Sequence, residues 1–198
     1  MNRSLVIGTY VVGTAFAWTA LGRLIANDDL AQRGVTSGTG LVACLLLLVA
    51  PGATFIPLAR WAQAPLYDIE GMLGWGALAL TLAFLEPADP PTLAQFLLFL
   101  IPLTVSIATV AALVSYLVGL RVYRYDPRRF DFLRARRQGY LASFSLIAIA
   151  LLHSVGTLSP ATGTLLIAVA VLAEMAALSR ARMSGSGTTR KNDYISTR

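Results

Sequence analysis

The chain has 198 residues, of which 56% are hydrophobic and 13% are charged, and its mean hydropathy is +0.67. A soluble globular domain carries about a quarter charged residues, so this composition excludes an ordinary soluble fold and predicts an all-α, polytopic transmembrane helix bundle. The formal net charge is +6, but the arginines gather at the ends of apolar runs, where membrane topology explains them, so we do not expect nucleic-acid binding.

Six apolar runs are long enough to predict membrane spans, because about 20 residues at about 1.5 Å rise each cross the hydrocarbon of a bilayer. The expected spans cover about residues 5–25, 35–58, 71–85, 92–120, 139–157 and 161–179. Together they predict one bundle over residues 1–180. The first run, preceded by Arg3, also has the shape of a signal peptide. Five further spans favour an uncleaved first helix.

The second span and the segment that follows it contain three prolines. Pro51 and Pro57 each remove a backbone donor, so we expect a bend near Pro51 and a neighbouring group that satisfies the freed carbonyl. Pro65 is expected to break the helix. Trp61 and Tyr67 lie beside charged residues around this break, which is typical of a membrane interface.

The segment 121–138 lies between the fourth and fifth spans and is strongly basic. It contains Arg121, Arg124, Arg128, Arg129, Arg134, Arg136 and Arg137. Placing it in the cytoplasm puts both chain termini in the cytoplasm as well, and leaves the arginine-free turns 86–91 and 158–160 outside. We predict that these arginines bind anionic lipid headgroups, dock a protein partner, or do both.

Two further segments outside the spans carry structural expectations. Asp126 and Pro127 are the residue types of a helix N-cap and first helical position, which predicts a short interfacial helix over 127–137. Residues 181–198 are rich in serine, glycine, threonine and charge and have no apolar stripe. We therefore predict a flexible cytoplasmic tail there.

Glu174 is the candidate functional residue inside a span, since it lies about 9 Å before Arg180 by helical rise. A carboxylate in hydrocarbon costs about 2 to 3 kcal/mol, so it should be protonated or meet a partner from another helix. Residues at the same expected depth on other spans are Ser115, Tyr116, Ser145, Thr54 and Tyr10. A structural hydrogen-bond layer or ion pair is the favoured interpretation; a proton- or ion-coupled transport site and a contact to a partner subunit are the alternatives.

Metal, cofactor and catalytic motifs are not found in the sequence. Cys44 is the one cysteine, which excludes an intramolecular disulfide and a multi-thiolate metal site. His153 could contact a pigment or haem, but a second histidine and an attachment motif are lacking. We therefore expect no metal, no cofactor and no catalytic residue, and favour a protein that is not an enzyme.

The sequence predicts a non-catalytic accessory or scaffold subunit of a larger membrane complex, associated with other membrane subunits or with itself. Its basic residues are arginines except for Lys191, which suggests a GC-rich bacterial genome and hence the bacterial inner membrane. The alternative is a small transporter or channel with Glu174 in its path. A weaker alternative is a lipid-modifying enzyme that holds a phosphate headgroup at the arginine segment.

Overall fold

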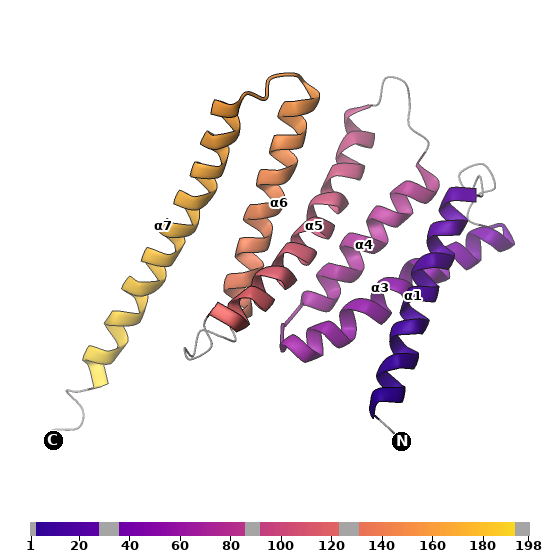
Figure 1. Cartoon of the computed structure of the whole chain (residues 1–198), viewed down its shortest axis with the longest axis horizontal. Helices are drawn as coiled ribbons and strands as arrows, with labels where there is room; N and C mark the ends of the chain where they lie inside the picture. The colour runs from indigo at the N-terminus through magenta and orange to yellow at the C-terminus, as the bar shows by residue number, and fades with distance from the viewer. Residues whose placement is uncertain (1–2, 28–35, 86–91, 123–130, 193–198) are drawn as a thin grey trace. The chain divides into compact units, whose positions relative to one another are not determined.

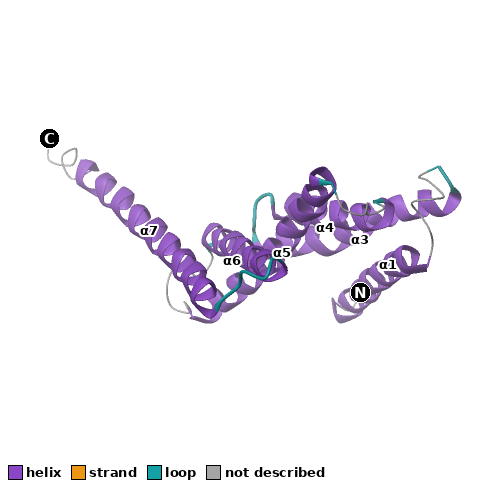
Figure 2. Cartoon of the chain, turned by 90° about the horizontal axis from the view of Figure 1, so that it is seen from above, coloured by secondary structure: helices purple, strands orange, loops and turns teal. Residues whose placement is uncertain are grey.

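The computed structural model describes residues 3–27, 36–85, 92–122 and 131–192, and the regular structure in these ranges is entirely helical (Figures 1 and 2). The helices are α1 (Arg3–Asn27), α3 (Gly38–Ala62), α4 (Tyr67–Phe84), α5 (Leu93–Val122), α6 (Phe132–Ser154) and α7 (Pro160–Asn192). The predicted all-helical class is confirmed. Contacts divide the chain into a first unit, Met1–Tyr140, and a second unit, Leu141–Arg198.

Two of these helices, α3 and α5, are long and apolar enough to cross a membrane. Only 33% and 28% of their most apolar windows are buried inside the protein, whereas the core helix of a soluble domain is mostly buried. The apolar part of α7, Pro160–Ala176, is shorter. Membrane association therefore has the support of two helices, and the six-span topology stays a prediction.

Helix α6 begins earlier than the expected fifth span. Its first turn is capped by Asp131, whose Oδ1 accepts a hydrogen bond from the backbone N–H of Arg134 at 3.1 Å. The capping pair expected at Asp126 and Pro127 lies outside the described residues. Arginines expected on a separate interfacial helix therefore stand on the first turns of α6. Helix α7 continues to Asn192, into the segment expected to be a tail.

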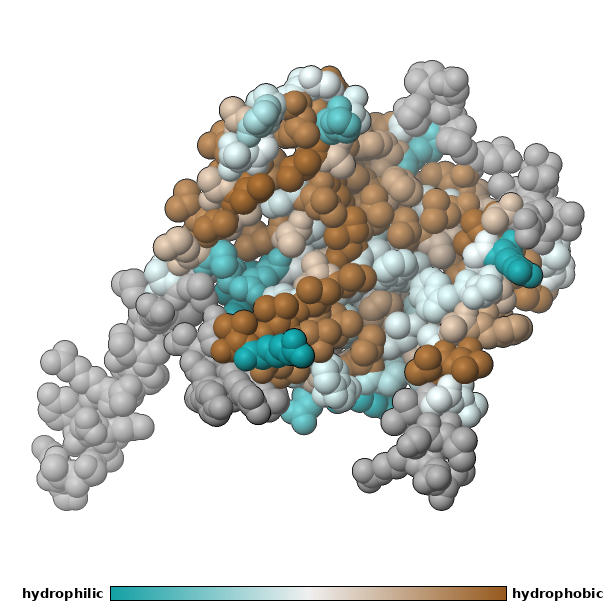
Figure 3. All heavy atoms as spheres, in the orientation of Figure 1, coloured by the Kyte–Doolittle hydropathy of each residue, from teal (hydrophilic) through white to brown (hydrophobic). Residues whose placement is uncertain are grey.

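The interior is built from small side chains. Among the nineteen hydrophobic residues that are buried in the described ranges, eleven are alanines. Large apolar residues instead face outward, as at Leu45 and Leu48, which are 63% and 67% exposed. Figure 3 shows broad apolar areas on the visible surface, with hydrophilic residues in separate patches. Small residues between helices and large apolar residues outside are typical of helices that pack in lipid.

In the first unit, α1 packs on α3, α3 on α4, and α4 on α5, as Figure 1 shows. Glycine allows the closest approaches. A Cβ at Gly139 would lie 2.6 Å from the backbone oxygen of Ala108 and 2.6 Å from the backbone nitrogen of Ala112. The first turns of α6 therefore lie directly against the backbone of α5.

Proline leaves a backbone carbonyl four residues earlier without its helical donor, and a neighbouring helix meets this carbonyl in α5. Pro102 frees the carbonyl of Leu98. The Thr81 hydroxyl on α4 shares its one proton between this oxygen, at 3.4 Å, and the Ala77 carbonyl of its own helix, at 2.8 Å. The contact therefore joins α4 to α5 at the proline.

The same arrangement occurs once more in α3, which continues as a helix through both of its prolines. Pro57 frees the carbonyl of Ala53, and the hydroxyl of Tyr10 on α1 donates to this oxygen. Pro51 frees the Leu47 carbonyl, and a Cβ at Gly76 on α4 would lie 3.4 Å from it. The carbonyl freed by Pro57 thus receives a donor from α1, and the carbonyl freed by Pro51 lies beside the backbone of α4 at Gly76.

Candidate functional site

An ion pair joins the start of α4 to the start of α6. The Glu70 side chain accepts a charge-assisted hydrogen bond from the guanidinium of Arg136, and the Tyr140 hydroxyl donates to the same Oε1 atom at 3.1 Å. The side chains of Glu70 and Arg136 are only 16% and 29% exposed. An acidic residue in the first turn of a helix also interacts favourably with the helix dipole. The Glu70 carboxylate therefore links the starts of two helices.

Aromatic rings from four helices interlock beside this pair. Consecutive edge-to-face contacts, with centroids 5.1 to 6.0 Å apart, connect the aromatic cluster: Trp61, Tyr116, Phe132, Tyr67 and Phe55. Each such contact stabilises the fold by about 0.5 to 1.5 kcal/mol beyond its buried area. The cluster fixes one end of α3 and α5 against the starts of α4 and α6.

Tyr67 is the largest fully buried side chain and ties the cluster to α5. Its hydroxyl donates a hydrogen bond to the backbone oxygen of Thr109 at 3.0 Å. Burial, together with the nearby charge of Glu70, raises the pKa of Tyr67 to about 12. The phenol therefore remains a protonated donor at physiological pH.

Two tryptophans extend the polar contacts across the first unit. The indole N–H of Trp75 donates to the Thr109 hydroxyl at 3.2 Å, and that of Trp18 donates to the Thr54 hydroxyl at 2.8 Å. The two indole rings meet edge to face at 5.6 Å. These contacts link α1, α3, α4 and α5, so polar side chains in this unit serve as cross-links between helices.

The residues of the predicted intramembrane polar site fall in both units. In the first unit, Ser115 donates to the side-chain oxygen of Gln138 on α6, and Tyr116 belongs to the aromatic cluster. In the second unit, Ser145 and Glu174 are half-buried on α6 and α7. Their assembly into one polar layer stays a prediction.

The arginines of the predicted docking segment have different environments. Arg121 is exposed, Arg137 is half-buried and Arg136 pairs with Glu70. Arg134 is 9% exposed, and its guanidinium lies where a side chain at residue 119 would be, since a Cβ at Gly119 would collide with it. Outside the described residues lie Arg124, Arg128 and Arg129. Arg134 and Arg136 thus support the fold, while lipid or partner docking at the others stays a prediction.

Sequence reasoning did not single out Glu70, Tyr67 or Tyr140. A weak signal was available for Glu70, because the predicted topology places this acid on the same membrane side as the arginine segment. The choice of Arg136 among seven arginines depends on how α4 and α6 pack. Tyr67 was expected at an interface, and its burial follows from the same packing.

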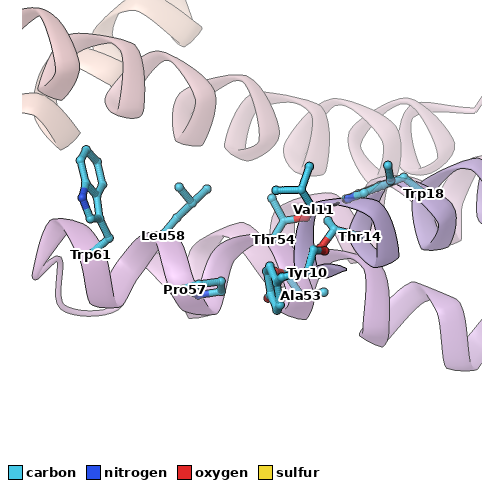
Figure 4. Close-up of a pocket in the computed structure, with 10 residues that line it drawn as sticks. Tyr10, Val11, Thr14, Trp18, Ala53, Thr54, Pro57, Leu58 and Trp61 are labelled. Carbon is cyan, nitrogen blue, oxygen red and sulfur yellow. Dashed lines mark hydrogen bonds between the residues drawn. The ribbon is translucent and has the colours of Figure 1, made fainter. Parts of the chain in front are cut away.

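An open groove of about 550 Å³ lies between α1 and α3 (Figure 4). Its lining residues are Tyr10, Val11, Thr14, Ala15, Trp18, Ala53, Thr54, Pro57, Leu58 and Trp61. Figure 4 shows Trp61 and Trp18 at opposite ends of this row. We call this feature the α1–α3 groove.

The hydroxyl groups along the α1–α3 groove are already hydrogen-bonded within the protein. The Tyr10 hydroxyl donates to the carbonyl of Ala53. The Thr14 hydroxyl donates to the carbonyl of Tyr10 at 2.9 Å, and the Thr54 hydroxyl donates to the carbonyl of Ala50 at 3.0 Å. The groove therefore presents a largely apolar wall.

Within the described parts of the chain, no group of three or more His, Cys, Asp or Glu side chains could hold a metal ion. Cys44 is a half-buried free thiol, and His153 is exposed near the end of α6. The geometry thus offers charged and aromatic cross-links and one apolar groove. Comparison with protein-family models, curated proteins and solved structures finds no match for this chain.

Proposed function

We propose that this chain is a six-span protein of the bacterial inner membrane, with both termini in the cytoplasm, and that it acts as a non-catalytic accessory or scaffold subunit of a larger membrane complex. The observation that carries the proposal is an outward stripe of apolar residues on α5. Val110, Val114, Leu117 and Val118 recur at helical spacing and are 46% to 54% exposed. Such a face suits contact with lipid or with a neighbouring subunit.

The distribution of polar groups supports the same role. In the first unit, Glu70 and Arg136 bind each other, and Tyr67 and Trp75 bind α5. These groups strengthen contacts between the helices of the chain itself. The outward faces of the helices and the exposed arginines are then the surfaces available for assembly.

The Glu70–Arg136 pair also agrees with the proposed topology. The third and fifth predicted spans both run from the cytoplasm outward, so the starts of α4 and α6 should lie on one side of the membrane. An ion pair between these starts supports that arrangement. Arg23, exposed near the end of α1, is less favourable to this topology, because it would lie on the outer side, where arginines are uncommon.

The topology is tested with Asp89→Cys in a Cys44→Ala background. We expect an impermeant thiol reagent added to intact cells, outside the inner membrane, to label this cysteine. Arg121→Cys in the same background is the matched control and should be labelled only after the membrane is opened. Labelling of Asp89→Cys from the cytoplasmic side alone would contradict the six-span arrangement.

The scaffold role is tested by extracting the tagged protein gently from its own membrane and measuring the mass of the intact particle. We expect other membrane subunits in a fixed ratio. A particle that contains only this chain would contradict the accessory role and favour the transporter alternative, with Glu174 as the first residue to mutate.

The contribution of the arginine segment is tested separately. Replacement of Arg121, Arg128 and Arg129 by glutamine leaves the inward Arg134 and Arg136 intact. We expect weaker retention of the associated subunits, because arginines contribute strongly to protein interfaces. The matched control replaces Arg180, Arg182 and Arg190, and it should retain the subunits. Equal retention by both variants would mean that the helix faces, rather than the segment, hold the partners.

A further inference from the structure

We infer that the α1–α3 groove binds one acyl chain of an anionic phospholipid, with the lipid phosphate beside Arg60. The inference relies on the membrane location proposed above but not on the scaffold role. The α1–α3 groove is a surface of the first unit that its hydrogen bonds and ring contacts between helices do not fill. Both helices of the groove belong to that unit.

The chemistry of the groove wall favours a hydrocarbon ligand. The hydroxyls of Tyr10, Thr14 and Thr54 each donate to a backbone carbonyl, and the Trp18 N–H is bonded to Thr54. A polar ligand would find few free donors or acceptors along most of its length, whereas an acyl chain needs none. The volume of about 550 Å³ lies within the range of about 300 to 1,000 Å³ that small-molecule sites occupy.

The presence of the groove follows from side-chain size. Ala15 and Ala53 contribute only methyl groups where larger residues would close the space between the helices. Pro57 frees the backbone carbonyl of Ala53 on the α3 side of the groove, and the Tyr10 hydroxyl donates a hydrogen bond to it, so this carbonyl does not add a free polar group to the wall. The result is an apolar groove along α1 and α3, which in the proposed location faces membrane lipid.

One end of the groove has the features of a headgroup site. Trp61 stands at this end in Figure 4, is 58% exposed and offers its indole N–H. Arg60 precedes it in the last turn of α3, is exposed and forms no ion pair in the described parts of the chain, in contrast to Arg136. In the proposed topology this end lies at the cytoplasmic leaflet, which is rich in anionic lipid. Charge complementarity therefore favours an anionic headgroup over a zwitterionic one.

The experiment uses the full chain, stripped of lipid in detergent and then titrated with phosphatidylglycerol or phosphatidylcholine of the same acyl composition. Native mass spectrometry counts the lipids retained. We expect one phosphatidylglycerol to bind about fivefold more tightly than phosphatidylcholine, as one arginine near an anionic lipid would give. Equal retention of the two lipids would overturn the headgroup assignment.

Two variants locate the site. Ala15→Leu combined with Ala53→Leu fills the groove and should remove the tightly held lipid. Ala26→Leu combined with Ala94→Leu makes the same changes at exposed positions outside the groove, and it should bind lipid like the parent protein. Unchanged lipid retention in the groove-filled protein would overturn the inference. The inference would also be overturned if the parent protein formed a dimer and the groove-filled protein did not, because a second copy of the chain would then be the occupant of the groove.

Arg60→Gln provides a test that does not disturb packing, since this side chain is exposed. We expect it to abolish the preference for phosphatidylglycerol while leaving the unfolding temperature unchanged. A preserved preference would overturn the role of Arg60 even if the groove-filled variant failed to fold. Lipid binding is measured on the isolated chain, so it does not depend on whether the chain belongs to a larger complex. A failure of the lipid inference can therefore be distinguished from a failure of the scaffold proposal.

Discussion

The aromatic cluster and the α1–α3 groove share helix α3 but use it in opposite ways. In the cluster, Phe55 and Trp61 meet rings from α4, α5 and α6, and the ion pair lies beside them. In the groove, alanine and threonine leave an open volume between α3 and α1. The difference lies in side-chain size, because hydroxyls in both regions are hydrogen-bonded, that of Tyr67 in the cluster and those of Tyr10 and Thr14 in the groove.

The comparison separates two roles of polar groups in an apolar protein. Where a polar side chain reaches another helix, as from Tyr67 to Thr109, it cross-links the fold. Where it hydrogen-bonds to its own helix, as Thr14 does, its donor is satisfied and the surface becomes less polar, but no second helix is connected. We therefore expect changes at the contacts among α4, α5 and α6, including the aromatic cluster, to affect stability most and changes in the groove to affect binding.

The largest loss of stability is expected from Gly139→Ala. The added methyl group would meet the backbone of α5, which cannot move aside as a side chain can, so the free energy of unfolding should fall by about 3 kcal/mol. Gly13→Ala is the matched control, since its Cβ meets no atom within 4 Å and alanine favours the helix. Thermal unfolding in detergent measures both, and equal effects would refute the close α5–α6 contact.

Arg136→Gln should cost about 2 kcal/mol, because it leaves the half-buried carboxylate of Glu70 without its cation. The loss is smaller than for a fully buried pair because water still reaches both groups. Arg121→Gln, at an exposed arginine, should change stability by less than about 0.5 kcal/mol. A double-mutant cycle with Glu70→Gln checks the pairing, and additive effects would count against it.

Tyr67→Phe should cost about 1 to 1.5 kcal/mol, since it keeps the ring contacts but leaves the Thr109 carbonyl without this donor. The parent protein should also lose stability as the pH rises from about 10 to about 12. In that window the unfolded chain releases the phenol proton while the folded chain retains it.

The pH-dependent loss should be smaller in Tyr67→Phe, and denaturant titrations at several pH values would measure it. Tyr116→Phe is the control, because its ring belongs to the same cluster. If Tyr67→Phe preserved the full alkaline loss, another group would be its cause.

In the groove, Pro57→Ala and Tyr10→Phe should be coupled by about 0.5 to 1 kcal/mol. Tyr10→Phe removes the donor to the carbonyl that Pro57 frees, whereas alanine at residue 57 supplies a donor within the helix. The loss caused by Tyr10→Phe should therefore shrink in the Pro57→Ala background. Calorimetric unfolding of the four proteins gives the coupling, and identical losses in both backgrounds would disprove the compensation.

The smallest effect is expected from Glu174→Gln, at about 0.5 kcal/mol. Glu174 is half-buried on α7, outside the aromatic cluster, and glutamine keeps its shape and its hydrogen-bonding capacity. Glu70→Gln is the comparison, and it should cost more because Arg136 loses its anion. A larger loss at Glu174 than at Glu70 would show that the second unit contains its own organising polar site.

Long apolar runs made the spans at 35–58 and 92–120 predictable, and α3 and α5 follow them closely. The start of α6 was less accessible to sequence reasoning. The arginines at residues 134 and 136 were expected on a separate interfacial helix before the fifth span. In the fold, Arg134 fits against Gly119 and Arg136 binds Glu70, so the helix begins at Phe132.

The candidate site was less predictable than the helices because its contacts are distant in sequence. Glu70 and Arg136 are 66 residues apart, and Tyr67 and Thr109 are 42 apart. The groove was not predicted, since it depends on which faces of α1 and α3 meet. Tyr10 and Thr54 were placed at one depth by counting helical rise, and both line the groove.

The hydrogen bonds at the prolines have a consequence for the order in which contacts between helices can form during synthesis. Synthesis delivers α1 before α3 and α4 before α5. The hydroxyls of Tyr10 and Thr81 have therefore already been synthesised when the carbonyls freed by Pro57 and Pro102 are made. We expect a ribosome-bound chain that ends after α3 to have its first hairpin already joined, which cross-linking between α1 and α3 would detect.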